Sequence, residues 1–87
     1  MPIKVKVIES KELKIRNWIE TSLAVYSEKE HISIDEAKSL LMVNLKISPV
    51  QLGWWLNNNS QPSLEQGLKI AEFLGRSVNE IFKLTEV

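Results

Sequence analysis

Side chains that carry acid–base, nucleophilic or metal chemistry are few in this sequence and poorly spaced for it. There is one histidine, His31, and there is no cysteine, which removes thiolate metal sites and disulfides. Asp35 and Glu36 follow Ser33 at the spacing of a helix first turn, where carboxylates cap backbone N–H groups. We find no phosphate-binding loop and no metal-ligand spacing. We therefore expect a protein that is not an enzyme and that uses no metal and no cofactor.

The remaining polar chemistry is hydrogen bonding, and it gathers between residues 46 and 62. Lys46 is the one charged residue of this stretch, and Gln51 and the run Asn57-Asn58-Asn59-Ser60-Gln61 supply amides and a hydroxyl. Side-chain amides can form paired hydrogen bonds to base edges, and a lysine can neutralise a phosphate. The absence of acid favours a nucleic-acid partner, while the low density of basic residues predicts weak or cooperative binding.

Serines mark the expected starts of the elements that must position these residues. Ser33, Ser63 and Ser77 are each followed three residues later by Glu or Gln, the pattern of a capping box, and Ser48-Pro49 is a typical N-cap and first helical residue. Gly75 is placed as a helix C-terminal residue. These signals, with Ser10 as a further N-cap, predict five helices that begin at Ser10, Ser33, Ser48, Ser63 and Ser77 and end near residues 28, 44, 57, 74 and 82.

Apolar residues within these segments recur at the 3.6-residue period and define the expected core. The predicted buried positions include Ile15, Trp18, Ile19, Leu23, Tyr26, Ala37, Leu40, Leu41, Val43, Leu52, Trp55, Leu64, Leu68, Ala71, Leu74, Val78, Ile81 and Phe82. Trp54 points about 100° away from Trp55 and is expected at the surface, where it rests on neighbouring side chains, contacts a protein partner or contacts DNA. Gly53 admits close helix packing, which we favour, or close approach to a phosphate backbone.

Residues 1–9 form a separate segment with the alternation of a β-strand, the only strand signal we find. Ile3, Val5 and Val7 fall on one face, and Lys4 and Lys6 fall on the other. A lone strand needs a partner, so one interpretation is pairing with a second copy about a two-fold axis. The other is a disordered basic arm. Lys4 and Lys6 are either phosphate contacts or the solvated face of an edge strand.

The spacing of apolar residues from Ala37 to Trp55 predicts a helix-turn-helix at about residues 34–57. Counted from Lys46 as the turn residue, apolar positions lie five and one before it and one, six and nine after it. In this motif the first helix crosses the second steeply, and the second keeps one face free to enter the major groove. We place the groove-facing helix at Pro49–Asn57.

The segment PSLEQGLKIAEFLGRSVNEIF, with the preceding LLMVNLKISPVQLGWWL, resembles the helix-turn-helix domain of the lambda-repressor/Cro (XRE) family. The resemblance covers residues 33–84. It implies a homodimer on operator DNA and assigns base-reading positions to Pro49, Val50, Gln51, Trp54 and Asn57. Lys46 and Asn58 stand where the family has glycine. Asn58 suits a left-handed backbone, whereas Lys46 either adopts that backbone at some cost or the turn differs from the family's. Lys46, Ser48 and Asn59 are the expected phosphate contacts.

Together these patterns predict an all-α fold: a five-helix lambda-repressor-like bundle over residues 10–87 with an N-terminal β-strand arm. The expected function is a sequence-specific DNA-binding transcriptional regulator, a repressor, that acts as a homodimer on a short palindromic operator. The alternatives are a protein-interaction module of the same fold, with its partner on the Trp54 surface, and the antitoxin of a toxin–antitoxin pair. No apolar run approaches the length of a membrane span, so we expect a cytoplasmic protein.

Overall fold

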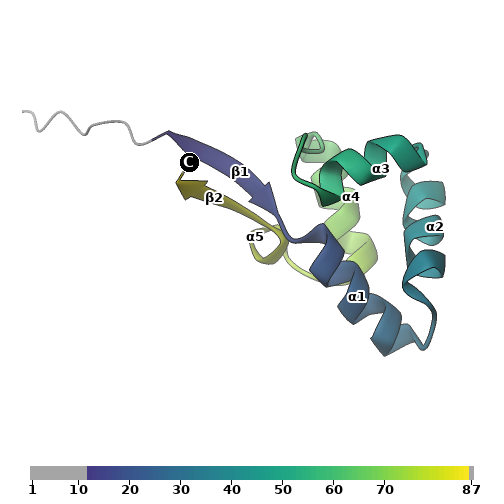
Figure 1. Ribbon diagram of the computed structural model, residues 1–87. Helices are drawn as coiled ribbons and strands as arrows, with labels where there is room; N and C mark the ends of the chain where they lie inside the picture. Colours follow the sequence, from purple (N-terminus) through teal and green to yellow (C-terminus); the bar gives the residue numbers. More distant parts are fainter. Residues whose placement is uncertain (1–11, 87) are drawn as a thin grey trace, which may run out of the picture.

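The computed structural model describes residues 12–86, in which five helices lie between two short strands in the sequence (Figure 1). The elements are β1 (Leu13–Asn17), α1 (Ile19–Glu30), α2 (Ile34–Leu45), α3 (Pro49–Leu56), α4 (Leu64–Leu74), α5 (Val78–Ile81) and β2 (Phe82–Glu86). The expected arm over residues 1–9, with Lys4 and Lys6, lies outside the described residues.

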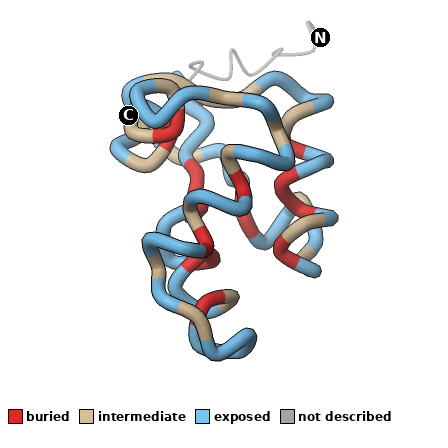
Figure 2. The backbone as a smooth tube through the Cα atoms, turned by 90° about the vertical axis from the view of Figure 1, so that its right-hand side faces the viewer, coloured by how far each residue is buried: buried red, intermediate tan, exposed pale blue. Residues whose placement is uncertain are grey.

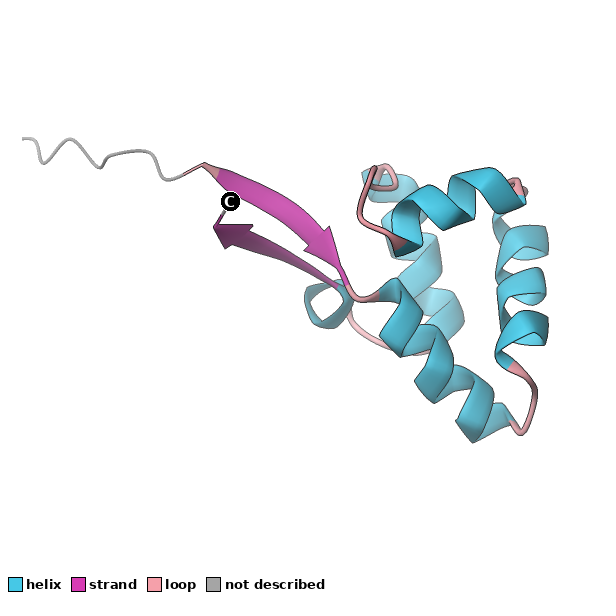
Figure 3. Ribbon diagram, viewed as in Figure 1, coloured by secondary structure: helices cyan, strands magenta, loops and turns pink. Residues whose placement is uncertain are grey.

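The prediction of an all-α fold is wrong, because β1 and β2 pair into a two-stranded antiparallel sheet, here called the β ribbon. Ile15 lies opposite Leu84, and Arg16 lies opposite Lys83. Figure 3 shows the ribbon projecting from the helices on the side opposite α2. The fold is therefore mixed, with a helical bundle whose first and last elements are strands.

The first helix begins eight residues later than predicted, with Trp18 instead of Ser10 at its N-cap position. The segment Leu13-Lys14-Ile15-Arg16 alternates apolar and basic residues, as a strand does, but Ile15 also falls on the helical period of Trp18 and Ile19. Backbone groups in β1 find partners in β2, which is distant in the sequence. A local pattern cannot reveal that pairing, so the helical period wrongly predicts a helix over residues 13–17.

Helix ends follow the expected local chemistry. Ser33, Ser48 and Ser63 each accept a hydrogen bond from the backbone N–H three residues on, at 3.1, 3.1 and 3.2 Å. Gln66 Oε1 accepts a hydrogen bond from the Ser63 N–H at 3.0 Å, which completes the predicted capping box there. Gly75 ends α4 in the left-handed conformation at φ 66°, as predicted. These caps explain why the four later helices start at or within one residue of the predicted places.

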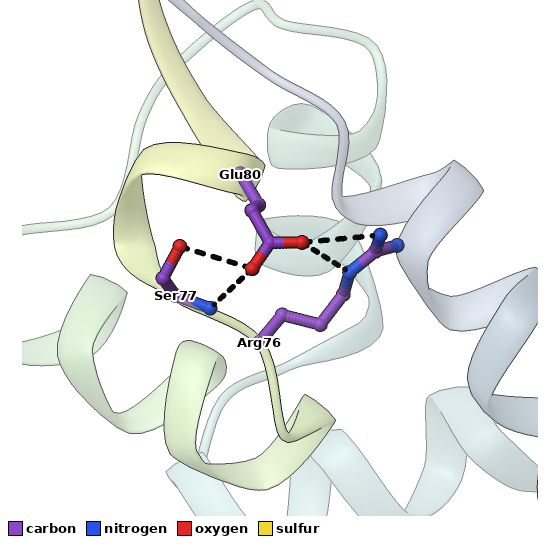
Figure 4. Close-up of polar contacts among 3 residues, drawn as sticks. All are labelled: Arg76, Ser77 and Glu80. Atoms are coloured by element: carbon purple, nitrogen blue, oxygen red, sulfur yellow. Dashed lines mark hydrogen bonds and ion pairs between the residues drawn. The ribbon is translucent and has the colours of Figure 1, made fainter.

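Short helix α5 is fixed at its start by Glu80 (Figure 4). The Ser77 backbone N–H and the Ser77 hydroxyl both donate to Glu80 Oε1, at 3.1 and 3.0 Å. Arg76 pairs with the other carboxylate oxygen at 3.3 Å. The two Ser77 hydrogen bonds, and then the Arg76 charge, lower the pKa of Glu80. The carboxylate therefore joins α5 to the loop before it, directly ahead of β2.

The core lies where the four longer helices and α5 face one another, and Figure 2 shows buried backbone concentrated there. Predicted core residues that are buried are Ile19, Leu23, Ala37, Leu41, Leu52, Trp55, Ala71, Leu74 and Ile81. Predicted core residues that are exposed are Ile15, Leu40, Val43, Leu64 and Leu68, while Trp18, Tyr26, Val78 and Phe82 are half-buried. In α4 the buried face passes through Gly67, Ile70, Ala71 and Leu74, which turns Leu64 and Leu68 outward. Within residues 12–86 no helix is long and apolar enough to cross a bilayer.

Candidate nucleic-acid interface

The turn between α2 and α3 is built on Lys46, which adopts the left-handed conformation at φ 56° and ψ 47°. The Ile47 N–H donates to the Met42 carbonyl at 3.1 Å, and the Lys46 N–H donates to Val43 at 3.3 Å, so the last carbonyls of α2 are satisfied. Ile47, Met42 and Leu45 pack against the core and close the corner. Of the two alternatives for Lys46, the left-handed backbone is the one that the structure shows, and the Lys46 side chain is exposed.

Helix α3 lies across one end of the bundle, close to the end of α2 (Figure 1). Its inner face is fixed by Leu52 and Trp55, both buried, as predicted. Its outer face, defined here by Val50, Trp54 and Asn57, is exposed, with Val50 61% and Trp54 53% accessible. The two apolar side chains stand one helical turn apart, so they form one strip on the surface.

Gly53 lies in the same turn of α3 as Trp54, and no other described element packs closely against it. A Cβ placed on it would meet no atom within 4 Å. Our favoured interpretation, close packing against another helix, is therefore wrong. A helical glycine costs about 1 kcal/mol relative to alanine, and nothing inside residues 12–86 explains that cost. The open notch that it leaves lets another molecule approach the α3 backbone.

Polar side chains at the start of α3 keep part of their hydrogen-bonding capacity within the described residues. Ser48 Oγ accepts from the Gln51 backbone N–H at 3.1 Å, and the Ser48 hydroxyl proton stays available for a further acceptor. Pro49 occupies the first helical position and is exposed. The Gln51 side chain is half-buried, and its amide makes no hydrogen bond to the rest of residues 12–86. That amide can therefore bond to an external donor–acceptor pair.

A buried amide network that sequence analysis missed holds the C-terminal end of α3. Asn17 Nδ2 donates to the Trp55 carbonyl at 2.8 Å and to Gln61 Oε1 at 2.7 Å. Asn17 Oδ1 accepts from the Ile19 N–H at 3.1 Å, and the Asn17 N–H donates to Asn58 Oδ1 at 2.7 Å. Asn58 has φ 59°, the left-handed backbone predicted for it. Asn17 thus joins β1, α1 and the α3–α4 loop.

The β ribbon brings positive charge next to this network. Arg16 and Lys83 are directly opposite on one face, and Lys14 follows two residues away on the same face; we call these three the basic ribbon face. Like charges opposite each other normally repel. Here the Trp18 ring lies beneath both, 6.0 Å from the Arg16 guanidinium carbon and 5.6 Å from Lys83 Nζ. Trp18 therefore supports a cationic surface, instead of filling the core as predicted.

Predicted site residues within the described chain fall into two groups. Val50, Trp54 and Asn57 share the outer face of α3, and Asn59 is exposed in the loop beyond it. The second group, Lys46, Ser48, Pro49 and Gln51, surrounds the turn and the start of the same helix. Sequence analysis missed the basic ribbon face, because Lys14 and Arg16 are separated from Lys83 by most of the chain and no local pattern pairs them.

Among residues 12–86, no group of three or more His, Cys, Asp and Glu side chains could hold a metal ion. Comparison with protein-family models, with curated proteins and with solved structures gives no match. Function must therefore be inferred from the geometry of the α2–α3 surface and its surroundings.

Proposed function

We propose that this chain is a sequence-specific DNA-binding transcriptional regulator of the helix-turn-helix type that acts as a homodimer on a short two-fold operator. The observation that carries the proposal is the combination of a tight turn at Lys46 with an α3 whose outer face is exposed in the part of the chain that the structure describes. Leu52 and Trp55 anchor α3 to the core, and about one turn of the helix precedes them. The exposed face of such a helix can enter the major groove, which is about 12 Å wide.

Roles follow from position and chemistry. Gln51 lies near the start of α3, its side-chain amide has no hydrogen-bond partner among residues 12–86, and it is the candidate for paired hydrogen bonds to adenine. Val50 offers a methyl surface for thymine, and the Gly53 notch allows the sugar–phosphate backbone to come close. Lys46 and Ser48 bind phosphate at the start of the helix, and Asn57 and Asn59 do so with neutral donors at its end. Repression then follows from occlusion of a promoter.

The test begins with selection of bound duplexes from a random pool, followed by titrations of the selected and a scrambled duplex. Gln51→Ala should lower affinity for the selected duplex by about tenfold and leave the scrambled duplex nearly unchanged, because it removes a base contact. Lys46→Ala should weaken both duplexes alike and reduce the salt slope by about one. Lys29→Ala, an exposed lysine at the far end of α1, is the matched control and should change neither.

A second candidate function, a protein-interaction module, is favoured by a specific observation. Val50 and Trp54 are large, exposed and apolar, and α3 carries no charged residue. Exposed tryptophan is frequent in interface hot spots. A salt titration separates the two functions, because duplex affinity falls steeply as salt rises while an apolar partner surface keeps its affinity. Failure of the wild-type chain to bind any duplex at low salt would refute the DNA proposal and favour the partner surface. An antitoxin role would place the toxin on this surface.

A further inference from the structure

Exposed aliphatic side chains gather on the side of the β ribbon opposite the basic ribbon face. The antiparallel register puts Leu13, Ile15, Phe82 and Leu84 on one face, here called the apolar ribbon face, with Asn17 and Glu86 at its two ends. Leu13, Ile15 and Leu84 are all exposed, although aliphatic residues at three neighbouring positions of a small sheet are usually covered. The described chain provides no element that covers this face.

A groove continues the apolar ribbon face onto α4. It has a volume of about 390 Å³ and runs between Ile15 and Leu84 on the ribbon and Leu64 and Gly67 on α4, with Phe82 and Val78 among its walls. Leu64 is 76% exposed at the first position of α4, and Leu68 is exposed one turn later on the same helix. The surface therefore combines a projecting apolar ribbon with an apolar groove at its base.

We propose that the apolar ribbon face and this groove form the interface with a second copy of the chain, related by a two-fold axis. One surface supplies both the part that inserts and the part that receives, which is what an isologous interface requires. Leu13, Ile15, Leu64, Leu68 and Leu84 are each about half to three-quarters exposed, so burying them would cover on the order of 500 Å² in each copy, before the groove walls are counted. A stable dimer needs roughly 600–1,000 Å² per partner.

Charge distribution supports an apolar partner on this face. Lys14 and Arg16 extend from the opposite side of the ribbon. Lys83 contacts Trp18 on that side, as Arg16 does, but it also lines the groove. Covering the apolar ribbon face leaves Lys14 and Arg16 in water, so dimerisation does not require their desolvation, and Lys83 is the cation that lines the groove. The inference rests on the proposed function in one respect: a two-fold operator requires a protein with two-fold symmetry. It replaces the strand at residues 1–9 as the predicted dimer contact.

The experiment measures the mass of the full chain by sedimentation without DNA. We expect a dimer for the wild type and a dissociation constant at least about tenfold weaker for Leu64→Glu, because the symmetric interface contains the new charge twice. A glutamate at the first position of α4 favours the helix dipole, so this variant should stay folded. Val43→Glu is the matched control, since Val43 is also 76% exposed but lies on α2. It should dimerise as the wild type does.

Three outcomes would overturn the proposal: a monomeric wild type, equal dimer affinity for Leu64→Glu and the wild type, or loss of the dimer in Val5→Lys but not in Leu64→Glu. The last result would return the contact to the N-terminal segment. Duplex binding is scored separately. A wild type that dimerises through Leu64 but binds no duplex supports the interface and refutes the DNA-binding function. A monomeric wild type that binds a single half-site refutes the interface and supports DNA binding.

Discussion

Removal of the Asn17 side chain is the sharpest test of how the site is held in place. In Asn17→Ala, the Ile19 N–H loses its hydrogen-bond acceptor in a fully buried position, and the Trp55 carbonyl and Gln61 lose a donor. The Trp55 carbonyl keeps the Asn58 N–H at 3.0 Å, and the half-buried Gln61 can be rehydrated. The dominant cost is therefore one orphaned buried donor plus two lost bonds, about 2–4 kcal/mol in total.

Denaturant unfolding followed by circular dichroism measures this loss directly. A domain of this size has a free energy of unfolding of roughly 5–10 kcal/mol, so the expected change is large. Asn59→Ala makes the same chemical change at an exposed loop position whose side chain has no partner within residues 12–86, and should cost less than about 0.5 kcal/mol. Asn17→Asp keeps the acceptor for the Ile19 N–H but loses both donors, and should also destabilise.

Equal unfolding free energies for Asn17→Ala and Asn59→Ala would refute this reasoning, because the network would then contribute nothing beyond an exposed amide. A second readout is duplex affinity. Since Asn17 anchors the C-terminal end of α3 but is buried, Asn17→Ala should weaken the selected and the scrambled duplex alike, without the discrimination expected of Gln51.

Three further changes give distinct signs. Lys46→Gly removes the strain of a left-handed lysine, so it should raise the free energy of unfolding by up to about 1 kcal/mol and lower duplex affinity. His31→Gly is the control: His31 ends α1 with φ 56°, so this variant should be stabilised in the same way but keep its duplex affinity. Gly53→Ala should stabilise the fold by about 1 kcal/mol, since its Cβ meets open space, yet weaken binding if the notch receives a backbone; unchanged affinity would remove Gly53 from the interface. Glu80 has a lowered pKa in the folded state, so its stabilising effect is present above the unfolded-state pKa and is lost as pH falls through the folded value; Glu80→Gln should melt below the wild type at neutral pH, and the two should converge in acid.

Helix-capping residues made most of the helical part predictable from the sequence. Ser33, Ser48, Ser63 and Gly75 set helix ends through hydrogen bonds to residues three or four positions away, and such bonds leave a mark in the sequence. The left-handed turns at Lys46 and Asn58 were likewise visible, by alignment with a familiar pattern of glycines. The helix starts predicted at Ser33, Ser48, Ser63 and Ser77 were therefore correct, whereas the start predicted at Ser10 was wrong because Leu13–Asn17 pairs as β1.

The sheet and the amide network were not predictable because their partners are far apart in the chain. Leu13–Asn17 becomes a strand only because Phe82–Glu86 pairs with it, and neither segment has a turn signal that links them. Asn17 looks like any surface amide until Trp55 and Gln61 surround it. For the same reason the predicted core included Leu64, since its exposure depends on which side of α4 faces the bundle.

Closure of the β ribbon has a consequence for the order in which the chain folds. The Thr85 hydroxyl and the Lys14 carbonyl are 71 positions apart, yet they meet at 3.3 Å. Bringing such distant segments together has a large entropic cost unless the helices between them have already collapsed. Amide hydrogens of β1 and β2 should therefore exchange with deuterium sooner than those of α1 and α4, and the slowest of them should report the free energy of the opening that separates the two strands.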